Sequence, residues 1–256
     1  MGGRLIKLTD RWVLVSFPGT YIILFYFYIV NNSQLAEYLF THMLNIKMFT
    51  FSPIAENTYV LYNDFKNAII IDPGCYFPEE REELQSFIEG EGLTVQKLIN
   101  THCHLDHIFG NKFVADTFTL PLHLHPKEKI MLERAPASGL MFNLPFDNFG
   151  GEMIFLEDGD TVKLDNDTLE VIFAPGHSPG HICFYCREQH FIISGDVLFK
   201  DNIGRTDLPG GNQEILLRSI RERLFVLPDE VVVHPGHGPD TTIGTEKREN
   251  PFVGES

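Results

Sequence analysis

Short apolar runs recur along the chain from residue 48 onward, and most of them end at a glycine or a polar residue. In the first half, these runs predict strands at residues 48–51, 57–62, 68–71, 95–100 and 120–124. The run at 68–71 is apolar at every position, which is typical of a strand buried on both faces. In the second half, residues 169–173 alternate between apolar and polar, and further strands are predicted at 182–185, 191–194 and 230–233.

Helices are predicted between several of these strands. Leu84, Phe87 and Ile88 recur at helical spacing, with a proline before them and glycines after them. Three further helices are predicted: a short helix through Phe113, a helix at 127–134 and a helix with Asn212 as its N-cap. Residues 138–151 show no clean period and are expected to form a long loop with exposed apolar side chains. The alternation of strands and helices predicts an α/β fold with helices on the outer face of a sheet.

The first part of the chain has a different pattern. Residues 12–30 contain no charge and approach the ~20 apolar residues that span a bilayer. Arg4, Lys7 and Arg11 precede this segment, and by the positive-inside rule they would hold the N-terminus in the cytoplasm. The segment is therefore one candidate for a membrane anchor.

A second interpretation of this region is equally open. A proline and a glycine interrupt the apolar segment, and Met43 and Met48 precede the patterned sequence, as they would after a non-native upstream extension or a tail. We divide the chain into an extension, residues 1–47, and a domain, residues 48–256. We expect a cytoplasmic protein or, if residues 12–30 insert, a membrane-anchored one.

The charge and the cysteine content of the chain limit the partners and the compartment that we expect. The chain has 35 Asp and Glu residues against 20 Lys and Arg, which gives a formal net charge of −15. Such a surface repels phosphate backbones, so we expect no nucleic acid partner. The four cysteines are too few and too scattered for a disulfide scaffold, which suits a reducing compartment. Cys183 and Cys186 fall within a predicted strand and are expected to be small apolar strand residues.

Side chains that can bind metal ions directly follow several of the apolar runs. These are His102 and His104 in the first half, and His177, Asp196 and His237 in the second. Strand ends at one edge of a sheet can meet in space, and nitrogen and carboxylate ligands suit zinc, iron or manganese. Because alternate residues of an extended chain share a face, His102 and His104 can bind one ion together.

Asp106 and His107 come just after the first pair, where a tight turn can aim them at a second ion. Glycines beside His177, Asp196 and His237 allow sharp turns of the backbone next to the metals. Each of these residues alone is better explained as a core histidine or a turn aspartate. Their joint occurrence at the ends of apolar runs predicts a metal centre.

The order of these motifs resembles the metallo-β-lactamase superfamily. The motifs are H-x-H-x-D-H at 102–107, A-P-G-H at 174–177, S-G-D at 194–196 and P-G-H-G at 235–238. The resemblance covers roughly residues 48–256 and implies an α/β metallo-β-lactamase αββα four-layer sandwich, with two sheets face to face and helices outside. It also implies that one metal is held by His102, His104 and His177, a second by Asp106, His107 and His237, and that Asp196 bridges them.

A site of this kind is suited to hydrolysis. Two metal ions ~3.5–4 Å apart share a water whose pKa falls toward ~7, which supplies hydroxide without a general base. One metal also polarises the substrate carbonyl. The resemblance therefore implies a dinuclear metal-dependent hydrolase in which Asp106 and Asp196 act with a metal-bound hydroxide. We expect two divalent ions, zinc first, with iron or manganese as alternatives.

Two further stretches, residues 198–211 and 242–252, are similar to the glyoxalase II-like hydrolases, which cleave hydroxyacylglutathione thioesters. A leaving thiolate needs little help from a general acid because the thiol pKa is only ~8.5. Full-length members of that group carry a C-terminal helical region that binds glutathione, and this chain resembles a short form without it. We therefore expect a thioesterase with a small-molecule thioester substrate, and leave its acyl and thiol preferences open.

Some residues are expected to support the site without binding metal. Asp72 and His181 are candidates to hold ligands by hydrogen bonds from behind. Arg205 and Phe142 are candidates for substrate binding. Arg205 can meet a substrate carboxylate or pair with Asp207.

Phe142 belongs to an apolar group with Met141, Phe146 and Phe149. This group forms either a mobile lid over the metals or part of the core. The second H-x-H motif, His123 and His125, is not followed by Asp-His, so these two residues are expected to be structural.

Other activities of the same fold remain as alternatives. A persulfide dioxygenase-like iron oxidoreductase would use one iron, held by His102, His177 and Asp196, the two-histidine, one-carboxylate arrangement of oxygen-activating sites. A true β-lactamase is disfavoured by the carboxylate at Asp196 together with the Asp106-His107 pair.

Overall fold

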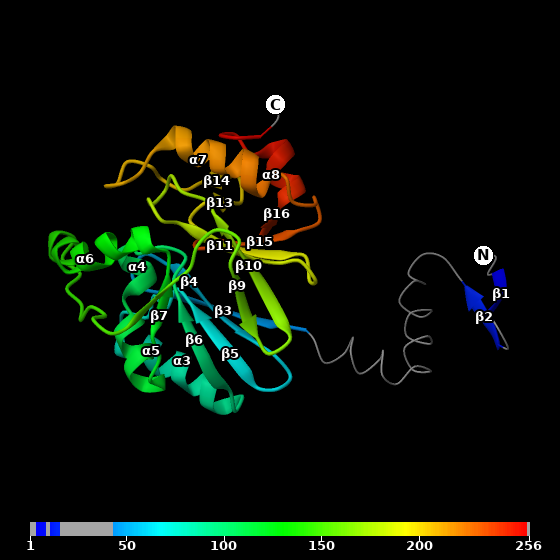
Figure 1. Cartoon of the computed structure of the whole chain (residues 1–256), viewed down its shortest axis with the longest axis horizontal. Coiled ribbons are helices and arrows are strands. Elements are labelled where there is room, and N and C mark those ends of the chain that lie inside the picture. Colours follow the sequence, from blue (N-terminus) through cyan, green and yellow to red (C-terminus); the bar gives the residue numbers. More distant parts are fainter. Residues whose placement is uncertain (1–3, 9–10, 16–42, 255–256) are drawn as a thin grey trace. The chain divides into compact units, whose positions relative to one another are not determined.

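A computed structural model describes residues 4–8, 11–15 and 43–254, and the chain divides into two units at Met43 (Figure 1). In the first unit, β1 (Arg4–Leu8) and β2 (Arg11–Val15) pair as antiparallel strands. The expected membrane segment at 12–30 thus begins in β2, and its remainder lies outside the described residues. In the described part of the chain, no helix combines the length and the apolar composition needed to cross a membrane.

The second unit, residues 44–256, begins with a six-stranded sheet. Its order is β3 (Asn45–Phe51), β4 (Glu56–Tyr62), β5 (Asn67–Ile71), β6 (Thr94–Ile99), β7 (Leu122–Leu124) and β8 (Met153–Phe155). The first three strands are antiparallel and the last three continue in parallel. The helices of this half are α3 (Pro78–Gly90), α4 (Leu105–Ile108), α5 (Asn111–Phe118), η1 (Pro126–Glu128) and α6 (Lys129–Met141).

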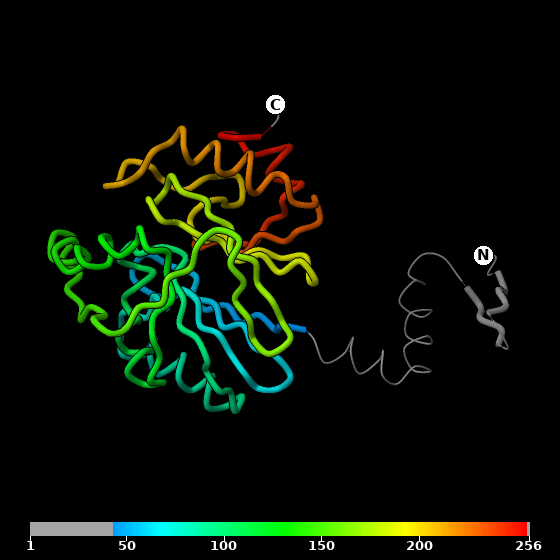
Figure 2. Tube along the Cα trace, viewed as in Figure 1, coloured from blue at the N-terminus to red at the C-terminus, as the bar shows by residue number. Residues whose placement is uncertain are grey.

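The second half forms another six-stranded sheet. Its order is β16 (Thr241–Thr242), β15 (Val232–Pro235), β12 (Phe191–Gly195), β11 (Ile182–Cys186), β10 (Asp167–Phe173) and β9 (Thr161–Leu164). A hairpin of β13 (Leu198–Phe199) and β14 (Asn202–Ile203) precedes α7 (Gln213–Ser219), the π-helical turn η2 (Ile220–Leu224) and, after β15 and β16, α8 (Ile243–Glu249). In Figure 2 the first half of this unit runs from blue to green and the second from yellow-green to red.

Alternate residues of each strand face different apolar layers, and this periodicity produces four layers of structure. In β4, Val60 faces the layer under the helices of the first half, whereas Tyr59 and Leu61 face the layer between the two sheets. In β11, Phe184 joins the layer between the sheets and Cys183 joins the layer under the helices of the second half. The predicted αββα sandwich is confirmed.

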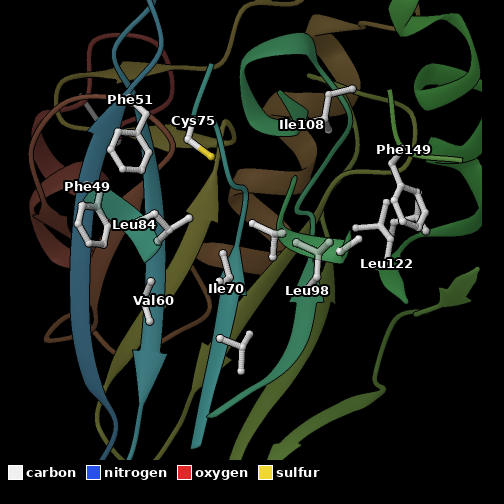
Figure 3. Close-up of a cluster of buried hydrophobic side chains, with 14 of the residues drawn as sticks. Phe49, Phe51, Val60, Ile70, Cys75, Leu84, Leu98, Ile108, Leu122 and Phe149 are labelled. Atoms are coloured by element: carbon white, nitrogen blue, oxygen red, sulfur yellow. The ribbon is translucent and has the colours of Figure 1, made fainter. Parts of the chain in front are cut away.

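The layer between the first sheet and its helices appears in Figure 3. Val60, Ile70 and Leu98, from three neighbouring strands, contribute to the same layer as Leu84 of α3. The run at 68–71 is fully buried, as predicted for a strand covered on both faces, because helices cover one face of β5 and the second sheet covers the other.

Helix α6 extends beyond the predicted helix at 127–134, and the prediction of a loop at 138–151 was wrong for residues 138–141. Pro136 lies inside the helix and cannot donate a backbone hydrogen bond to the carbonyl of Leu132. Asn148 donates its side-chain amide to that carbonyl at 2.8 Å. A contact from outside the helix thus satisfies the carbonyl that Pro136 leaves without its usual partner.

Several short elements were not predicted. Strands β8, β13, β14 and β16 have only two or three residues each, too few to show a periodic pattern. Helix α8 was also missed, although Thr242 caps it by accepting a hydrogen bond from the backbone N–H of Thr245.

The core between the sheets should carry much of the stability. Ile99, the last residue of β6, is fully buried between the sheets, whereas Gln96 on the same strand is exposed. Ile99→Ala should lower the free energy of unfolding by about 3 kcal/mol because it leaves a cavity. Urea unfolding of the full chain, followed by circular dichroism, measures this change, and Gln96→Ala serves as the control with a change below about 0.5 kcal/mol. Equal shifts in the two variants would contradict the burial of Ile99.

Candidate metal centre

The predicted ligand residues come together from both sheets. They are His102 and His104 after β6, Asp106 and His107 on α4, His177 after β10, Asp196 after β12, and His237 after β15. Glu56 of β4 forms an isolated bridge with His237, so the backbones of the two halves meet beside the site. Every apolar run that the sequence connected with a metal ligand therefore ends at this one place.

The first group consists of His102, His104 and His177, whose ligand atoms lie within 4.8 Å of one another. His177 Nε2 is 3.1 Å from His102 Nε2 and 2.7 Å from His104 Nδ1. Burial lowers the pKa of all three side chains, that of His104 to about 3, with further lowering from neighbouring histidines at His102 and His104. These imidazoles are therefore neutral at neutral pH, and each has one nitrogen with a free lone pair.

Hydrogen bonds determine which nitrogen carries the proton in two of these rings. His177 Nδ1 donates to the carbonyl oxygen of Arg205 at 2.7 Å. Thr101 Oγ1 donates to Asp72 and accepts from His102 Nδ1 at 3.0 Å. Both Nε2 atoms are left without a proton and face each other, an arrangement that a cation between them would stabilise.

The second group consists of Asp106, His107 and His237. His237 Nδ1 donates to the carbonyl oxygen of Ala55 at 3.0 Å, and its Nε2 lies 3.0 Å from Asp106 Oδ2. His107 Nδ1 donates to Asp72 at 3.0 Å. Its Nε2 is buried and has no hydrogen-bond partner. Here too, histidine Nε2 atoms face the space where an ion would bind.

Asp196 lies between the two groups. Its Oδ1 is 3.4 Å from His107 Nε2, and its Oδ2 is 3.5 Å from His177 Nε2 and 3.6 Å from His237 Nε2. Oδ1 is buried without a hydrogen-bond partner. A carboxylate that faces both groups at once has the position required of a bridging ligand.

The charges of the site favour cations. Burial lowers the pKa of His107, but the carboxylates of Asp196 and Asp106 outweigh burial and raise this pKa well above its usual value. Burial raises the pKa of Asp196, but His107 and His177 outweigh burial and lower it. The carboxylates are thus ionised and require positive charge nearby, which divalent metal ions supply more effectively than protons. The residues present therefore fit two such ions.

Asp72 supports the site from behind. Its two oxygens accept hydrogen bonds from the backbone N–H and hydroxyl of Thr101, the amide of Asn100 and Nδ1 of His107. Asp72, His102 and His107 also lie close enough to form a metal group, but these four hydrogen bonds already occupy the carboxylate. Asp72 has a φ of 50°, a left-handed conformation that aspartate tolerates better than most residues.

His181 lies behind Asp196, where its Nε2 accepts a hydrogen bond from the backbone N–H of Asp196 at 3.0 Å. Gly236 allows Asp196 to come close to the backbone, since a Cβ atom at this glycine would lie 2.1 Å from Asp196 Oδ1. The sharp turns expected beside the ligands occur at Gly176 and Gly195, which have positive φ angles of 131° and 49°.

Glu128 was not singled out from the sequence. It is fully buried and accepts hydrogen bonds from the backbone N–H of Cys103 at 2.8 Å and of Gly180 at 2.6 Å, and from the hydroxyl of Ser178. It therefore ties the loop of the first histidine motif to the loop that carries His177. No pattern in the sequence indicated this role, because Glu128 lies among the charged residues of a predicted surface helix.

A cavity of about 800 Å³ opens over the metal ligands. Phe142 and Arg205 line it, as expected of substrate-binding candidates. Arg205 donates two hydrogen bonds to Asp207, at 2.7 and 2.8 Å, so its guanidinium already has an anionic partner. A role of Arg205 in substrate binding stays a prediction.

The apolar group expected as a lid or as part of the core is partly buried and partly exposed, and a mobile lid stays a prediction. Phe149 is buried in the layer under the helices, and Phe146 packs edge-on against Phe109. Met141 and Phe142 are exposed at the end of α6, with 84% and 63% of their surface accessible. Only Phe142 of this group lines the cavity.

The second H-x-H motif lies apart from the metal groups in the part of the chain that the structure describes. His123 Nδ1 donates to the carbonyl of Leu98 at 3.1 Å, and His125 accepts from the backbone N–H of Lys127 as the cap of η1. Both histidines have the structural roles expected of them.

Comparison with known proteins identifies relatives along most of the chain. Residues 52–237 match the metallo-beta-lactamase superfamily. The hydroxyacylglutathione hydrolase GloC of Haemophilus influenzae is 39% identical over 212 residues, which cover 82% of this chain and 98% of that protein.

Two solved structures are also similar. The BLEG-1 B3 metallo-beta-lactamase has a TM-score of 0.76 and 40% identity over 82% of this chain and 99% of its own. TTHA1623 in a di-iron-bound form has a TM-score of 0.73 and 36% identity over 81% of this chain and all of its own (100%).

The hydrogen bonds to Asp72 lead to a test of metal affinity. Asp72→Asn replaces an oxygen that accepts hydrogen bonds with an amide group that cannot, and so disturbs the orientation of His107. We expect the affinity for zinc to fall by about 10- to 100-fold. Competition for zinc with a chelator of known affinity measures this change in affinity.

Asp165→Asn is the matched control. Asp165 also has a left-handed backbone, with φ 56°, and accepts hydrogen bonds from Asn63 and Asn67, but it is remote from the ligands. Its substitution should leave metal affinity unchanged. An equal loss in both variants would argue against a supporting role for Asp72.

Proposed function

The chain belongs to the metallo-β-lactamase superfamily as a metallo-hydrolase, and we propose that it hydrolyses small-molecule thioesters of the hydroxyacylglutathione type at a two-metal site. The similarity to a hydroxyacylglutathione hydrolase along 98% of that protein supports this substrate class. A cavity of about 800 Å³ is within the range that holds such molecules.

The lining of the cavity is the observation that favours a thioester. The acidic and imidazole side chains among its lining residues are Asp106, Asp196, His104, His177 and His237, all proposed as metal ligands. In the described part of the chain, no carboxyl or imidazole side chain other than these proposed ligands therefore lines the cavity to serve as a general acid. A thiolate can leave without one, because its conjugate thiol has a pKa of only ~8.5.

We assign the ligands as the geometry groups them. His102, His104 and His177 hold one ion, Asp106, His107 and His237 hold the second, and Asp196 contacts both. The two ions, when bound, acidify a water molecule and polarise the thioester carbonyl. Zinc and iron both suit this set of nitrogen and oxygen ligands, and the similar TTHA1623 was solved with two irons.

The chain's own groups position the reactants. Asp106 and Asp196 orient the attacking water through their carboxylate oxygens. Neutral His102 and His177 keep their Nε2 lone pairs directed at the site because Thr101 and the Arg205 carbonyl hold the opposite ring nitrogens. Apolar side chains such as Leu105 and Phe199 line the cavity and exclude bulk water from the reacting carbonyl.

The alternative, an iron oxidoreductase with one metal, uses only His102, His177 and Asp196. It would leave the second group, Asp106, His107 and His237, without a ligand role. The hydrolase accounts for both groups, and we therefore prefer it.

Turnover of S-lactoylglutathione tests the proposal. The full chain, loaded separately with zinc and with iron, should hydrolyse this thioester, and His102→Ala should lower kcat/KM at least about a hundredfold because metal-ion catalysis is worth several kcal/mol. His190→Ala, which removes an exposed histidine, is the control and should keep full activity.

The result can also reject the proposal. If the folded, metal-loaded protein leaves several thioesters intact, thioester hydrolysis is wrong. Oxygen uptake with glutathione persulfide then tests the iron oxidoreductase, and a β-lactam substrate tests the activity for which BLEG-1 is named.

A further inference from the structure

The charged residues of the cavity differ in sign from the chain as a whole. The chain has a formal net charge of −15. Apart from Asp106 and Asp196, which face the proposed metals, the charged side chains that line the cavity are Arg134, Lys200 and Arg205. A cavity with cationic walls in an acidic protein attracts anions and repels other cations.

These three cations are not equivalent. Arg205 donates two hydrogen bonds to Asp207, which offsets its charge locally. Arg134 and Lys200 form no ion pair and no side-chain hydrogen bond with any residue in the described ranges, and both are exposed. They are therefore the two lining cations whose charge is available to a ligand.

Arg134 and Lys200 come from different halves of the fold. Arg134 lies on α6, where Met131 and Ala135 of the same helix also line the cavity. Lys200 lies in the turn between β13 and β14, next to Phe199, which lines the cavity as well. A ligand whose reacting carbonyl lies at the metals would thus meet one cation from the first half of the fold and one from the second.

We propose that Arg134 and Lys200 bind anionic groups on the thiol part of the substrate, so that the site selects anionic thioesters over neutral ones. This inference rests on the proposed thioester hydrolysis. The apolar residues beside each cation then contact the chain of the thiol, while the ionised groups of the thiol meet the two cations. Arg205, paired with Asp207, contributes less to this selection than the sequence suggested.

Paired kinetic measurements test the proposal. The variants are Arg134→Met, Lys200→Met and the double variant, and the substrates are anionic S-lactoylglutathione and neutral S-lactoyl-N-acetylcysteamine. Each single substitution should raise KM for the glutathione thioester roughly fivefold, as expected for an exposed ionic contact, and leave kcat unchanged. For the neutral thioester, the KM and kcat of each variant should stay within about twofold of the wild-type values.

Lys163→Met is the matched control. Lys163 is also exposed and free of ion pairs among the described residues, but it lies on β9, outside the cavity lining. The Lys163→Met substitution removes the same charge as Lys200→Met. It should therefore change the KM for neither substrate by more than about twofold. If Lys163→Met raised the KM for the anionic thioester as much as Lys200→Met does, the proposal would be overturned. The change would then be a general effect of net charge.

A binding measurement separates this proposal from the proposed function. S-hexylglutathione is a thioether that cannot be hydrolysed, and calorimetry with the full chain measures its affinity without turnover. The double variant should bind it roughly twentyfold more weakly than the wild type. That loss would support the role of the two cations even if no thioester were hydrolysed. Equal binding by wild type and double variant, or equal KM changes for the anionic and neutral thioesters, would overturn it.

Discussion

The structure depends on one electrostatic constraint: neutral imidazole lone pairs and ionised carboxylates converge in a buried space. His102 and His177 direct unprotonated Nε2 atoms toward each other, and Asp196 faces both groups of ligands. Such an arrangement is unfavourable without positive charge at its centre, because each group has lost its solvating water. Metal coordination offsets that cost, and the fold around the site is organised to present these atoms to a cation.

The two sheets are held together where the ligands meet. Ligands from the first half follow β6 and lie on α4, and those from the second half follow β10, β12 and β15. Of the two buried carboxylates that support the ligands, Glu128 reaches across this junction and Asp72 does not. Asp72 holds His107 and Thr101 within the first half, whereas Glu128 joins the loop at Cys103 to the loop at Gly180. Buried carboxylates that are not among the proposed ligands thus help to orient the ligands, together with the backbone carbonyls that hold His177 and His237.

The cavity connects this centre to substrate choice. The carboxyl and imidazole side chains of the lining are all proposed ligands, and the proposed thioester has a leaving group that needs no further acid. The remaining charged lining residues are cations. In the proposed function, the centre would select the type of bond that is cleaved, and the cationic walls would select the charge of the molecule that carries it.

The sequence by itself determined the α/β class, most of the strands and the set of candidate ligands, because each ligand follows a strand whose periodicity is local. The unbroken apolar run at 68–71 also indicated that β5 is buried on both faces. Local patterns could not determine the length of α6, since Pro136 lies inside it and the carbonyl of Leu132 is satisfied by Asn148 from outside the helix. Nor could they identify Glu128, or show that Asp207 pairs with Arg205 while Arg134 and Lys200 stay unpaired. These features depend on contacts between residues far apart in the chain or on the path of a loop, and only the tertiary structure decides which side chains meet.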